Sequence, residues 1–395
     1  MPFEGSSLSE RLKLALFSDI LKEGVDGVTH TLHSLIQRVP ASSVDLLLVT
    51  GYPPSPGVRL PFPVLVVPRL INPFHDDAPL SWPFFNRRLG QRLDAFAPDL
   101  VHFSSPSFLG WYALSYGKRR GIPVVSIYHT HFLSYFPYYF RRWPRLGMQS
   151  KRLFEWFMRK LYNRCDRLFV PTPSIRSELV QVGIEAGRLA VWGRGVDTEL
   201  FHPGRRDLAY ADDLCGPATR RVLFVGRLVW EKELHTLAGI YERFQATRPD
   251  IRMVVTGTGR RERELRRLMP RAVFTGRLKG TELARMYASA DVFVQPSMTD
   301  TFSNVVLEAM ASGLPCVVAA CGGPRDVVHD AVDGYHAVPR DVEDFCARIE
   351  ELVDNPERRR TFGERAAAFA RTQQWDDLCR DLLDQYARVA RGVSC

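Results

Sequence analysis

The sequence has few features that would tie the chain to a membrane interior or to an oxidising compartment. It contains no uninterrupted run of 18 apolar residues, which argues against a transmembrane helix. The apolar run near its amino terminus is only six residues long and follows an acidic and polar lead, so we interpret it as a first strand and not as a signal peptide. Its seven cysteines include no C-x-x-C pair, and we expect them to be reduced thiols in a cytoplasmic protein.

Acidic residues are in the minority, with 44 Asp and Glu against 53 Lys and Arg, which gives a net charge of +9. The excess is concentrated between Arg141 and Arg176, where ten basic residues are accompanied only by Glu155 and Asp166. One interpretation is a solvated helical face that is rich in arginine. The other is attraction to an anionic surface, either a membrane or a nucleic acid.

The length of 395 residues is too great for one ordinary hydrophobic core, so we expect two domains. The apolar content of 45% and the charged content of 25% are typical of a soluble globular protein. Short apolar runs alternate with helical patterns through both halves of the chain, which indicates an α/β fold built from parallel sheets.

The segment from Pro296 to Asp326 organises the rest of the chain. The apolar run from Asp291 to Ser297 predicts a buried strand that ends in a polar turn. The pattern from Asn304 to Ser312 predicts a helix with Ser303 as its N-cap, and Cys316 to Ala320 predicts a second strand. Two strands joined by a short helix form a βαβ unit, whose ligands bind beyond the carboxyl ends of the strands.

Two carboxylates lie eight residues apart around the start of this helix, at Asp300 and Glu308. The backbone amides at a helix start suit a phosphate group. A carboxylate beside them is badly placed for the phosphate itself but well placed for neutral hydroxyls, such as those of a ribose or a sugar. The combination suggests a nucleotide sugar as ligand, and the alternative is an ordinary βαβ unit with a chance acidic pair.

The same segment resembles the Glu-x7-Glu motif of retaining glycosyltransferases of family 4. Glu308, Ala309-Met310-Ala311, Gly313 and Pro315 match the motif, whereas Asp300 stands where Glu is usual and Ser303 where Gly is usual. The resemblance implies the GT-B fold, in which two Rossmann-like domains face one another across a cleft and a C-terminal helix crosses back to the N-terminal domain. On this basis we expect the domains to span residues 1–203 and 204–370, with residues 371–395 forming the returning helix around Trp375. Residues 210–219 are polar and are expected to belong to the connection between the domains.

Further matches imply roles for individual residues. The sequence from Gly226 to Lys232 resembles the family's G-R-x-x-x-E-K element, in which Arg227 and Lys232 hold the donor's diphosphate. The Y-H-T-x-F pattern makes His129 the candidate to contact the donor from the opposite domain, although a structural histidine is the alternative. Asp300 is assigned to the donor sugar and Glu308 to the ribose. We therefore expect Arg227, Lys232, Asp300 and His129 to be catalytic, and the donor-binding residues to be Gly27, Gly226, Gly257, Leu278, Thr301, Phe302, Ser303, Asn304 and Glu308.

The resemblance implies transfer of a hexosyl unit, mannosyl or glucosyl, from a UDP-sugar or GDP-sugar to an acceptor hydroxyl with retention at the anomeric carbon. No cofactor is expected, and because the chain contains no D-x-D triplet we expect no metal requirement. The acceptor is expected to be a lipid or a lipid-linked glycan. The alternatives are a transferase with a soluble acceptor, a sugar-nucleotide epimerase of the same fold and a non-catalytic nucleotide-sugar binding protein.

The basic region also holds an unusual density of aromatic residues, from Phe132 to Tyr162. We expect a helix from about Met148 to Asn163, and we expect its face of Leu153, Trp156, Phe157 and Leu161 to pack in the core. The aromatics from Tyr135 to Trp143, beside Arg141, Arg142 and Arg145, suit a membrane interface or single-stranded nucleic acid. With a sugar-transfer motif in the same chain, we favour peripheral contact with an anionic membrane on its cytoplasmic face and expect no nucleic acid partner.

Overall fold

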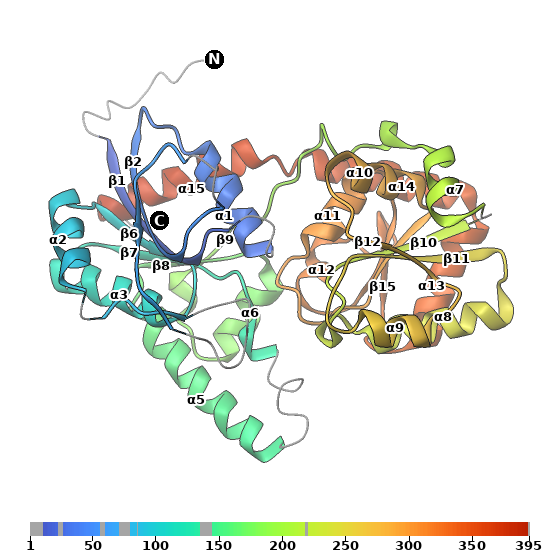
Figure 1. Ribbon diagram of the computed structural model, residues 1–395, viewed down its shortest axis with the longest axis horizontal. Coiled ribbons are helices and arrows are strands. Elements are labelled where there is room, and N and C mark those ends of the chain that lie inside the picture. The colour runs from blue at the N-terminus through green and yellow to red at the C-terminus, as the bar shows by residue number, and fades with distance from the viewer. Residues whose placement is uncertain are drawn as a thin grey trace.

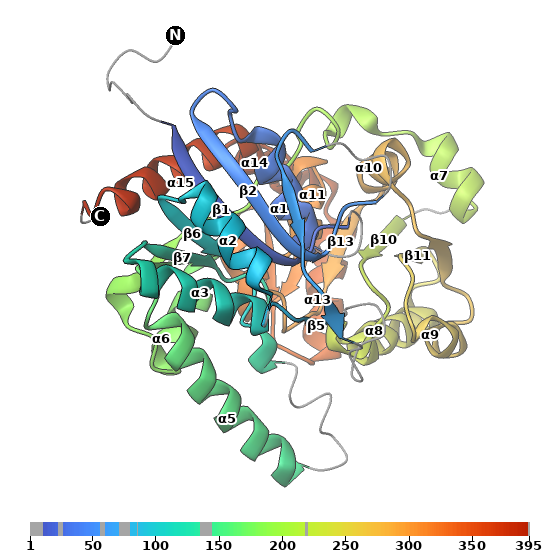
Figure 2. The same cartoon turned by 60° about the vertical axis from the view of Figure 1, so that its left-hand side comes forward.

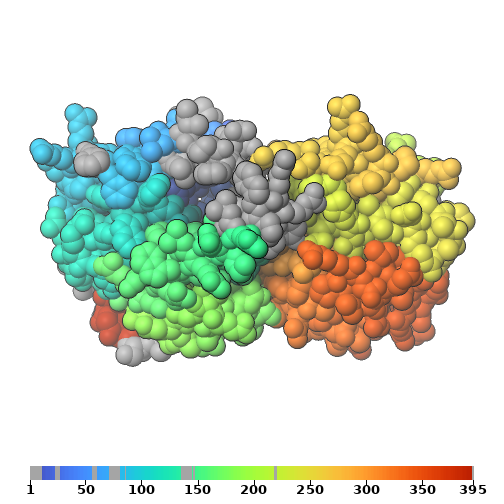
Figure 3. Space-filling view, turned by 90° about the horizontal axis from the view of Figure 1, so that it is seen from below, coloured from blue at the N-terminus to red at the C-terminus, as the bar shows by residue number. Residues whose placement is uncertain are grey.

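The computed structural model describes residues 11–22, 27–55, 60–70, 80–84, 86–134, 144–217 and 220–393. These residues form two lobes that lie side by side, one from the first half of the chain and one from the second (Figure 1). The space-filling view from below shows the two lobes side by side and in contact (Figure 3). The arrangement confirms the expected α/β architecture of two Rossmann-like halves.

The first lobe is built on a seven-stranded sheet in the order β3-β2-β1-β6-β7-β8-β9. Every neighbouring pair in it is parallel. Its inner strands are largely buried apolar runs, as expected for a sheet covered by helices on both faces, whereas the edge strands β3 and β9 are partly exposed. They are β1 (Leu12–Ile20), β2 (Val44–Tyr52), β3 (Val64–Val66), β6 (Leu100–Phe103), β7 (Val124–Ile127), β8 (Arg167–Val170) and β9 (Leu189–Val191).

Helices cover both faces of this sheet (Figure 1). A small antiparallel pair, β4 (Arg69–Leu70) with β5 (Leu80–Ser81), lies beside it and was not predicted from the sequence. The helical segments are α1 (Gly27–Arg38), α2 (Arg87–Phe96), α3 (Phe108–Arg120), α5 (Pro144–Tyr162), α6 (Pro173–Gln181) and the 3-10 turns η1 (Ala186–Arg188) and η2 (Pro203–Arg205).

The second lobe repeats the plan with a six-stranded parallel sheet in the order β12-β11-β10-β13-β14-β15. Its strands are β10 (Arg220–Val225), β11 (Ile251–Thr256), β12 (Val273–Gly276), β13 (Val292–Gln295), β14 (Cys316–Ala319) and β15 (Gly334–Ala337). Its helical segments are α7 (Leu208–Cys215), η3 (Trp230–Lys232), α8 (Leu234–Thr247), α9 (Glu262–Leu268), α10 (Gly280–Ser289), α11 (Asn304–Ala311), α12 (Gly322–Val327), α13 (Val342–Asp354) and α14 (Pro356–Arg371).

The last helix, α15 (Trp375–Ala390), returns to the first lobe, as the resemblance implied (Figure 1). Its buried residues join the apolar cluster between the first sheet and α1. The indole Nε1 of Trp192 donates to the carbonyl of Leu378 at 2.8 Å. Gly195 admits the Trp375 ring, because a Cβ atom at this glycine would lie only 2.6 Å from it.

Two expectations about local structure were wrong. Residues 210–219 do not form a plain connection, because α7 occupies Leu208–Cys215 and buries Ala211 and Cys215 in the core of the second lobe. On α5, Leu153 and Trp156 do not pack in the core; they are 66% and 50% exposed.

The reason for the second error is visible in both ribbon views, where α5 extends away from the first lobe (Figures 1 and 2). Of the expected face, Leu161 is buried in the core and Phe157 packs against it, and Met158 and Tyr162 complete the buried side of the helix. Arg145, which the sequence placed beside the aromatic segment, is exposed on this helix. The segment from Tyr135 to Trp143, with Arg141 and Arg142, lies outside the described residues.

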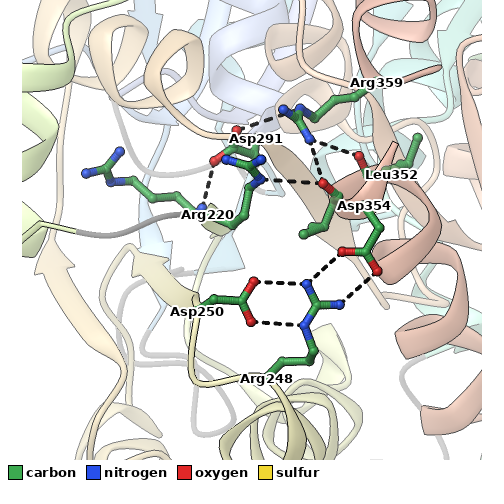
Figure 4. Close-up of polar contacts among 9 residues, drawn as sticks. Arg220, Arg248, Asp250, Asp291, Leu352, Asp354 and Arg359 are labelled. Carbon is green, nitrogen blue, oxygen red and sulfur yellow. Dashed lines mark hydrogen bonds and ion pairs between the residues drawn. The ribbon is translucent and has the colours of Figure 1, made fainter. Parts of the chain in front are cut away.

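The amino-terminal edge of the second sheet is held by ion pairs and carbonyl contacts (Figure 4). Arg248 forms two contacts each with Asp250 and Asp354, at 2.8–3.0 Å. Asp291 accepts from the backbone amide of Arg221 at 2.8 Å and lies 3.7 Å from Arg359. This network lies away from the carboxyl ends of the strands, so we interpret it as structural.

The order of strands reverses once in each sheet, between β1 and β6 in the first and between β10 and β13 in the second. At such a switch point the flanking connections leave in opposite directions and open a crevice at the carboxyl ends of the strands. Within the described residues, no helix is long and apolar enough to cross a membrane. The six cysteines described by the structure are free thiols, as expected.

Candidate active site

The switch point of the second sheet gathers the charged residues that the sequence singled out. Arg227 follows β10 and Asp300 follows β13, the two strands that flank the reversal. Lys232, at the end of η3, forms an ion pair with Asp300. Both side chains are largely covered, at 15% and 14% exposure. Because both side chains are partly removed from water, the attraction between the ammonium and the carboxylate is stronger than it would be at an open surface.

A buried amide that the sequence did not single out supports this pair. The side-chain Nε2 of Gln295 lies 3.5 Å from Asp300 Oδ2 and 3.4 Å from Ser303 Oγ, and its Oε1 has no partner among the described atoms. Gln295 is the last residue of β13, so the sequence signal was a polar residue closing a buried apolar run. It is in position to donate a long hydrogen bond to the Asp300 carboxylate.

The helix α11 starts differently from the prediction. Ser303 has φ +81° and makes no side-chain cap hydrogen bond. Its carbonyl accepts from the amides of Val306 and Leu307, at 3.1 and 3.4 Å. A positive φ is strained for a residue with a side chain, which explains why the resembling motif has glycine here.

The first lobe contacts this site through His129 and Gly27. Thr301 Oγ1 donates to the carbonyl oxygen of His129 at 2.8 Å. A Cβ atom added to Gly27 would lie 3.6 Å from Asn304 Nδ2, so the start of α1 meets the start of α11. The structure therefore brings together, across the two lobes, four residues that the sequence had assigned to the donor.

A second set of contacts between the lobes lies close by. Asp326, on α12, accepts from the backbone amide and from the hydroxyl of Ser174, both at 2.7 Å. Thr172 Oγ1 donates to the carbonyl of Thr301 at 3.4 Å. These contacts join the two lobes beside the site.

His129 is buried, and its Nε2 has no hydrogen-bond partner among the described atoms. Burial, the Arg194 charge and His102 lower the pKa of His129 well below its ordinary value. The ring is therefore neutral at physiological pH and can face a ligand without adding charge. The sequence did not single out Arg194, which is buried and donates to the carbonyls of Trp192 and Gly193.

Glu308 lies one turn into α11, and Tyr287 donates to its Oε2 at 3.1 Å. Burial raises the pKa of Glu308 to about 7, and the tyrosine hydrogen bond lowers it by less. A carboxylate that has only one hydroxyl donor among the described residues can accept further hydroxyl groups from a ligand.

The remaining donor-binding candidates lie around the glycine turns. Gly257 has φ +133°, and a Cβ atom there would lie 1.9 Å from the carbonyl oxygen of Gly226, so no side chain fits. Leu278 is partly buried against the core of the second lobe. Phe302 is buried in the same core, so only its backbone remains for a ligand.

Comparison with known proteins identifies the family of the chain. Residues 217–369 match the model of the family "Glycosyl transferases group 1", and residues 25–200 match that of "Glycosyltransferase Family 4". The chain is 30% identical to a GDP-mannose-dependent alpha-mannosyltransferase of Corynebacterium glutamicum, over 96% of this chain and 89% of the relative. It is 33% identical to Sulfoquinovosyl transferase SQD2 of Arabidopsis thaliana, over 94% of this chain and 72% of the relative.

Among solved structures, sucrose-phosphate synthase from Thermosynechococcus elongatus superposes with a TM-score of 0.77 at 20% identity. The superposition covers 97% of this chain and all of the other. At this identity the likeness concerns the fold.

Proposed function

The chain belongs to family 4 of the glycosyltransferases, and we propose on this basis that it transfers a mannosyl unit from GDP-mannose to a lipid acceptor with retention at the anomeric carbon. That it is a glycosyltransferase with a nucleotide-sugar donor follows from the family. The choice of GDP-mannose is supported by the name of the mannosyltransferase relative. SQD2 is named for a different sugar, so sulfoquinovosyl transfer is the second candidate.

The observation that carries the proposal is the Lys232–Asp300 ion pair at the switch point of the second sheet. Without a donor, the ammonium and the carboxylate neutralise each other. A bound donor offers Lys232 a diphosphate and Asp300 the hydroxyls of the sugar, so the two side chains are already at the position where both parts of the donor meet.

Several residues of the site stabilise the diphosphate leaving group. As the bond to the anomeric carbon breaks, negative charge grows on the diphosphate. Arg227, Lys232 and the backbone amides at Ser303 and Asn304 are the cationic and dipolar groups nearest that charge, and such preorganised groups supply a large share of catalysis. Glu308 accepts the ribose hydroxyls, and the neutral His129 faces the donor from the first lobe.

The transfer needs no metal in this scheme, because lysine, arginine and helix amides balance the diphosphate charge. Chelation with EDTA should leave the rate unchanged. Retention is tested on the product, where the anomeric coupling constant measured by NMR reports whether the configuration of the donor persists.

A lipid acceptor is supported by the exposed face of α5. Met148, Leu153 and Trp156 are 54%, 66% and 50% exposed, and Lys151 and Arg152 lie on the same helix. Apolar side chains beside cations suit the surface of an anionic bilayer, to which each cation contributes about 1 kcal/mol. The protein would bind such a surface peripherally and reversibly.

Two experiments test the proposal. The first offers GDP-mannose, UDP-glucose and UDP-sulfoquinovose to the protein and measures the nucleotide released, with and without vesicles of anionic phospholipid. Nucleotide release from GDP-mannose that increases with vesicles supports the proposal. Release only from another donor would show that the sugar of that donor, and not mannose, is transferred. No release from any donor would refute the transfer activity.

The second experiment is co-sedimentation with anionic vesicles at low and high salt. The wild type should pellet at low salt, and a Leu153→Glu, Trp156→Glu variant should stay in the supernatant. Val180→Glu is the control, because Val180 is also exposed, on α6, but is not part of the α5 face. Equal pelleting of the wild type and the α5 variant would contradict a membrane role for this helix.

A further inference from the structure

A buried arginine in the first lobe, Arg194, carries a positive charge that no described carboxylate balances. The residue is 3% exposed, and the structure shows no ion pair between it and a described aspartate or glutamate. Burial lowers the pKa of Arg194 to about 9, as happens when a cation is removed from water without a counter-ion. Because buried charges are normally paired, an unbalanced one calls for an explanation.

Part of the Arg194 guanidinium remains available to a ligand. Nη1 donates to the carbonyls of Trp192 and Gly193, both at 3.0 Å, and Cζ lies 4.8 Å from the centre of the Trp192 ring. Nε and Nη2 form no hydrogen bond with a described atom, and neither is one of the fully covered atoms that lack a partner. The two nitrogens therefore keep a narrow contact with solvent, and their N–H groups can reach an acceptor that enters from outside the protein.

The strand order places Arg194 on the edge of the first sheet that faces the donor site. The strands β7, β8 and β9 are consecutive neighbours, and His129, Thr172 and Arg194 follow their carboxyl ends. The first two contact Thr301, which lies just before the start of α11: its Oγ1 donates to the carbonyl of His129 at 2.8 Å, and its carbonyl accepts from Thr172 Oγ1 at 3.4 Å. Arg194 is one strand further along, and neighbouring strands are only about 4.8 Å apart, which is less than the reach of an arginine side chain.

His129 lies within the electric field of Arg194 and offers a further hydrogen-bonding group. Burial, and after it the charge of Arg194, lower the pKa of His129 and keep its imidazole neutral. The Nε2 atom of this imidazole is buried without a hydrogen-bond partner among the described atoms, and in one of the two neutral forms it carries the ring proton. An anionic oxygen between the two side chains would accept from Nε2 and balance the guanidinium at the same time.

We propose that Arg194 and His129 together bind an anionic oxygen group of the sugar donor from the first lobe. The inference rests on the proposed function, since it takes the ligand to be a nucleotide sugar. Two groups of such a donor have this chemistry: the diphosphate, and an acidic substituent on the sugar, such as the sulfonate of sulfoquinovose. In both cases Nε and Nη2 of Arg194 supply parallel N–H groups, in the fork geometry that suits two oxygens of one anion.

A purely structural role for Arg194 is the alternative. The next residue, Gly195, packs against Trp375, and the amide of Val196 donates to the carbonyl of Gln373 at 3.0 Å. The segment therefore belongs to the packing between the two chain segments that connect the lobes. In that role the only function of Arg194 would be to donate to the carbonyls of its own segment, and removal of its charge would not affect a ligand.

The test measures the dissociation constants of GDP, UDP-glucose and UDP-sulfoquinovose by titration calorimetry, for the wild type and for Arg194→Met. If the diphosphate is the bound group, Kd should rise about tenfold to a hundredfold for every one of these ligands that the wild type binds. If the sulfonate is the bound group, only the Kd for UDP-sulfoquinovose should rise, because UDP-glucose has a hydroxyl in place of the sulfonate. Kd values within about twofold of the wild type for every ligand would overturn the inference.

Arg167→Met is the matched control. Arg167 also donates from Nη1 to a backbone carbonyl, that of Gly187 at 2.8 Å, but it is the first residue of β8 and lies at the opposite edge of the same sheet. Every Kd should be unchanged in this variant. The melting temperature of each free protein tests the structural alternative, because a lower melting temperature of Arg194→Met together with unchanged Kd values would show a structural role and refute the inference.

A second variant, Arg194→Lys, keeps the test decisive if the methionine variant does not fold. Lysine keeps the positive charge but lacks the fork of parallel N–H groups, so Kd should rise severalfold for the same ligands. A lysine variant that binds every ligand within about twofold of the wild type would contradict recognition by the guanidinium.

Failure of this inference differs from failure of the proposed function. If the wild type binds a nucleotide sugar and transfers its sugar, and the Arg194 variants do so equally well, the function stands and the role of Arg194 is wrong. If the wild type neither binds nor hydrolyses nor transfers any nucleotide sugar, the proposed function itself is wrong.

Discussion

Each sheet has a carboxylate at its switch point, and the two carboxylates have opposite surroundings. At the switch point of the second sheet, Asp300 is paired with Lys232. At that of the first, Asp19 lies among serine hydroxyls with no ion pair to a described cation. The first arrangement suits a ligand that carries charge, and the second suits a neutral one. Strand order decides where a ligand binds, and the local side chains decide what kind of ligand it is.

The largest expected effect comes from removing a cation from the charged switch point. Arg227→Ala or Lys232→Ala should cost about 2–4 kcal/mol of transition-state stabilisation, which is the scale for losing a preorganised group. This corresponds to a fall of roughly 30- to 1,000-fold in kcat/KM. The measurement is initial-rate kinetics with GDP-mannose.

The control is Arg266→Ala, since Arg266 pairs with Glu262 on the surface of α9. It should leave kcat/KM unchanged. Turnover within about threefold of the wild type in either Arg227→Ala or Lys232→Ala would contradict the assignment of that cation to the donor's diphosphate. The switch point of the second sheet would then have no demonstrated role in binding a charged ligand.

The next effect separates the sugar from the nucleotide. Asp300→Ala should lower transfer by about a hundredfold while changing the dissociation constant of GDP by less than about threefold, because Asp300 is assigned to the sugar hydroxyls. Titration calorimetry with GDP measures the second quantity. Equal losses in both would mean that Asp300 acts on the nucleotide, or on the fold through Lys232, and not on the sugar.

The fold was largely predictable from the sequence because buried parallel strands are continuous apolar runs. The runs at Leu12–Phe17, Val44–Thr50 and Arg221–Val225 all lie in strands of the structure. The hydrophobic pattern gave a wrong prediction where no other layer of the protein covers an apolar helix face. Leu153 and Trp156 have helical spacing, and spacing reveals which residues share a face but not whether a second layer covers that face.

The site was predictable only where its residues are close in sequence. Asp300, Ser303 and Glu308 lie within one βαβ unit, so their spacing was visible. Asp19 gave no such signal, because Ser81 and Ser105 reach it from elements more than 60 residues away along the chain. Only the strand order brings those elements to one edge.

A smaller effect is expected from the ionisation of Glu308, whose pKa is raised to about 7. Below that pH the free enzyme carries a protonated Glu308, which accepts ribose hydroxyls less well than the carboxylate. If only the ionised form binds the donor, the KM for GDP-mannose should rise about tenfold from pH 8 to pH 6. Glu308→Gln should have a raised but flat KM over this range, and a wild-type KM that does not depend on pH would contradict the ribose assignment.

The smallest effect compares the serines that start the helices at the two switch points. Ser107 begins α3 with φ −118°, and its side chain accepts from the amide of Gly110 at 3.2 Å. Ser303 begins α11 with φ +81° and makes no such bond. The two serines therefore differ in how much they stabilise the start of their helices, although the sequence predicted Ser303 to be an N-cap.

Replacement by glycine should reveal this difference as a change of sign. Ser303→Gly relieves the positive φ and should raise the free energy of unfolding by about 1 kcal/mol, which for domains of this size is an increase of about 2–4 °C in Tm. Ser107→Gly loses a working cap and should lower the free energy of unfolding by a few tenths of a kcal/mol. Differential scanning calorimetry of both variants in the absence of donor measures the contrast. A fall in Tm for Ser303→Gly would mean that the contact of its hydroxyl with Gln295 outweighs the backbone strain, and that the serine is kept at the charged switch point for its side chain.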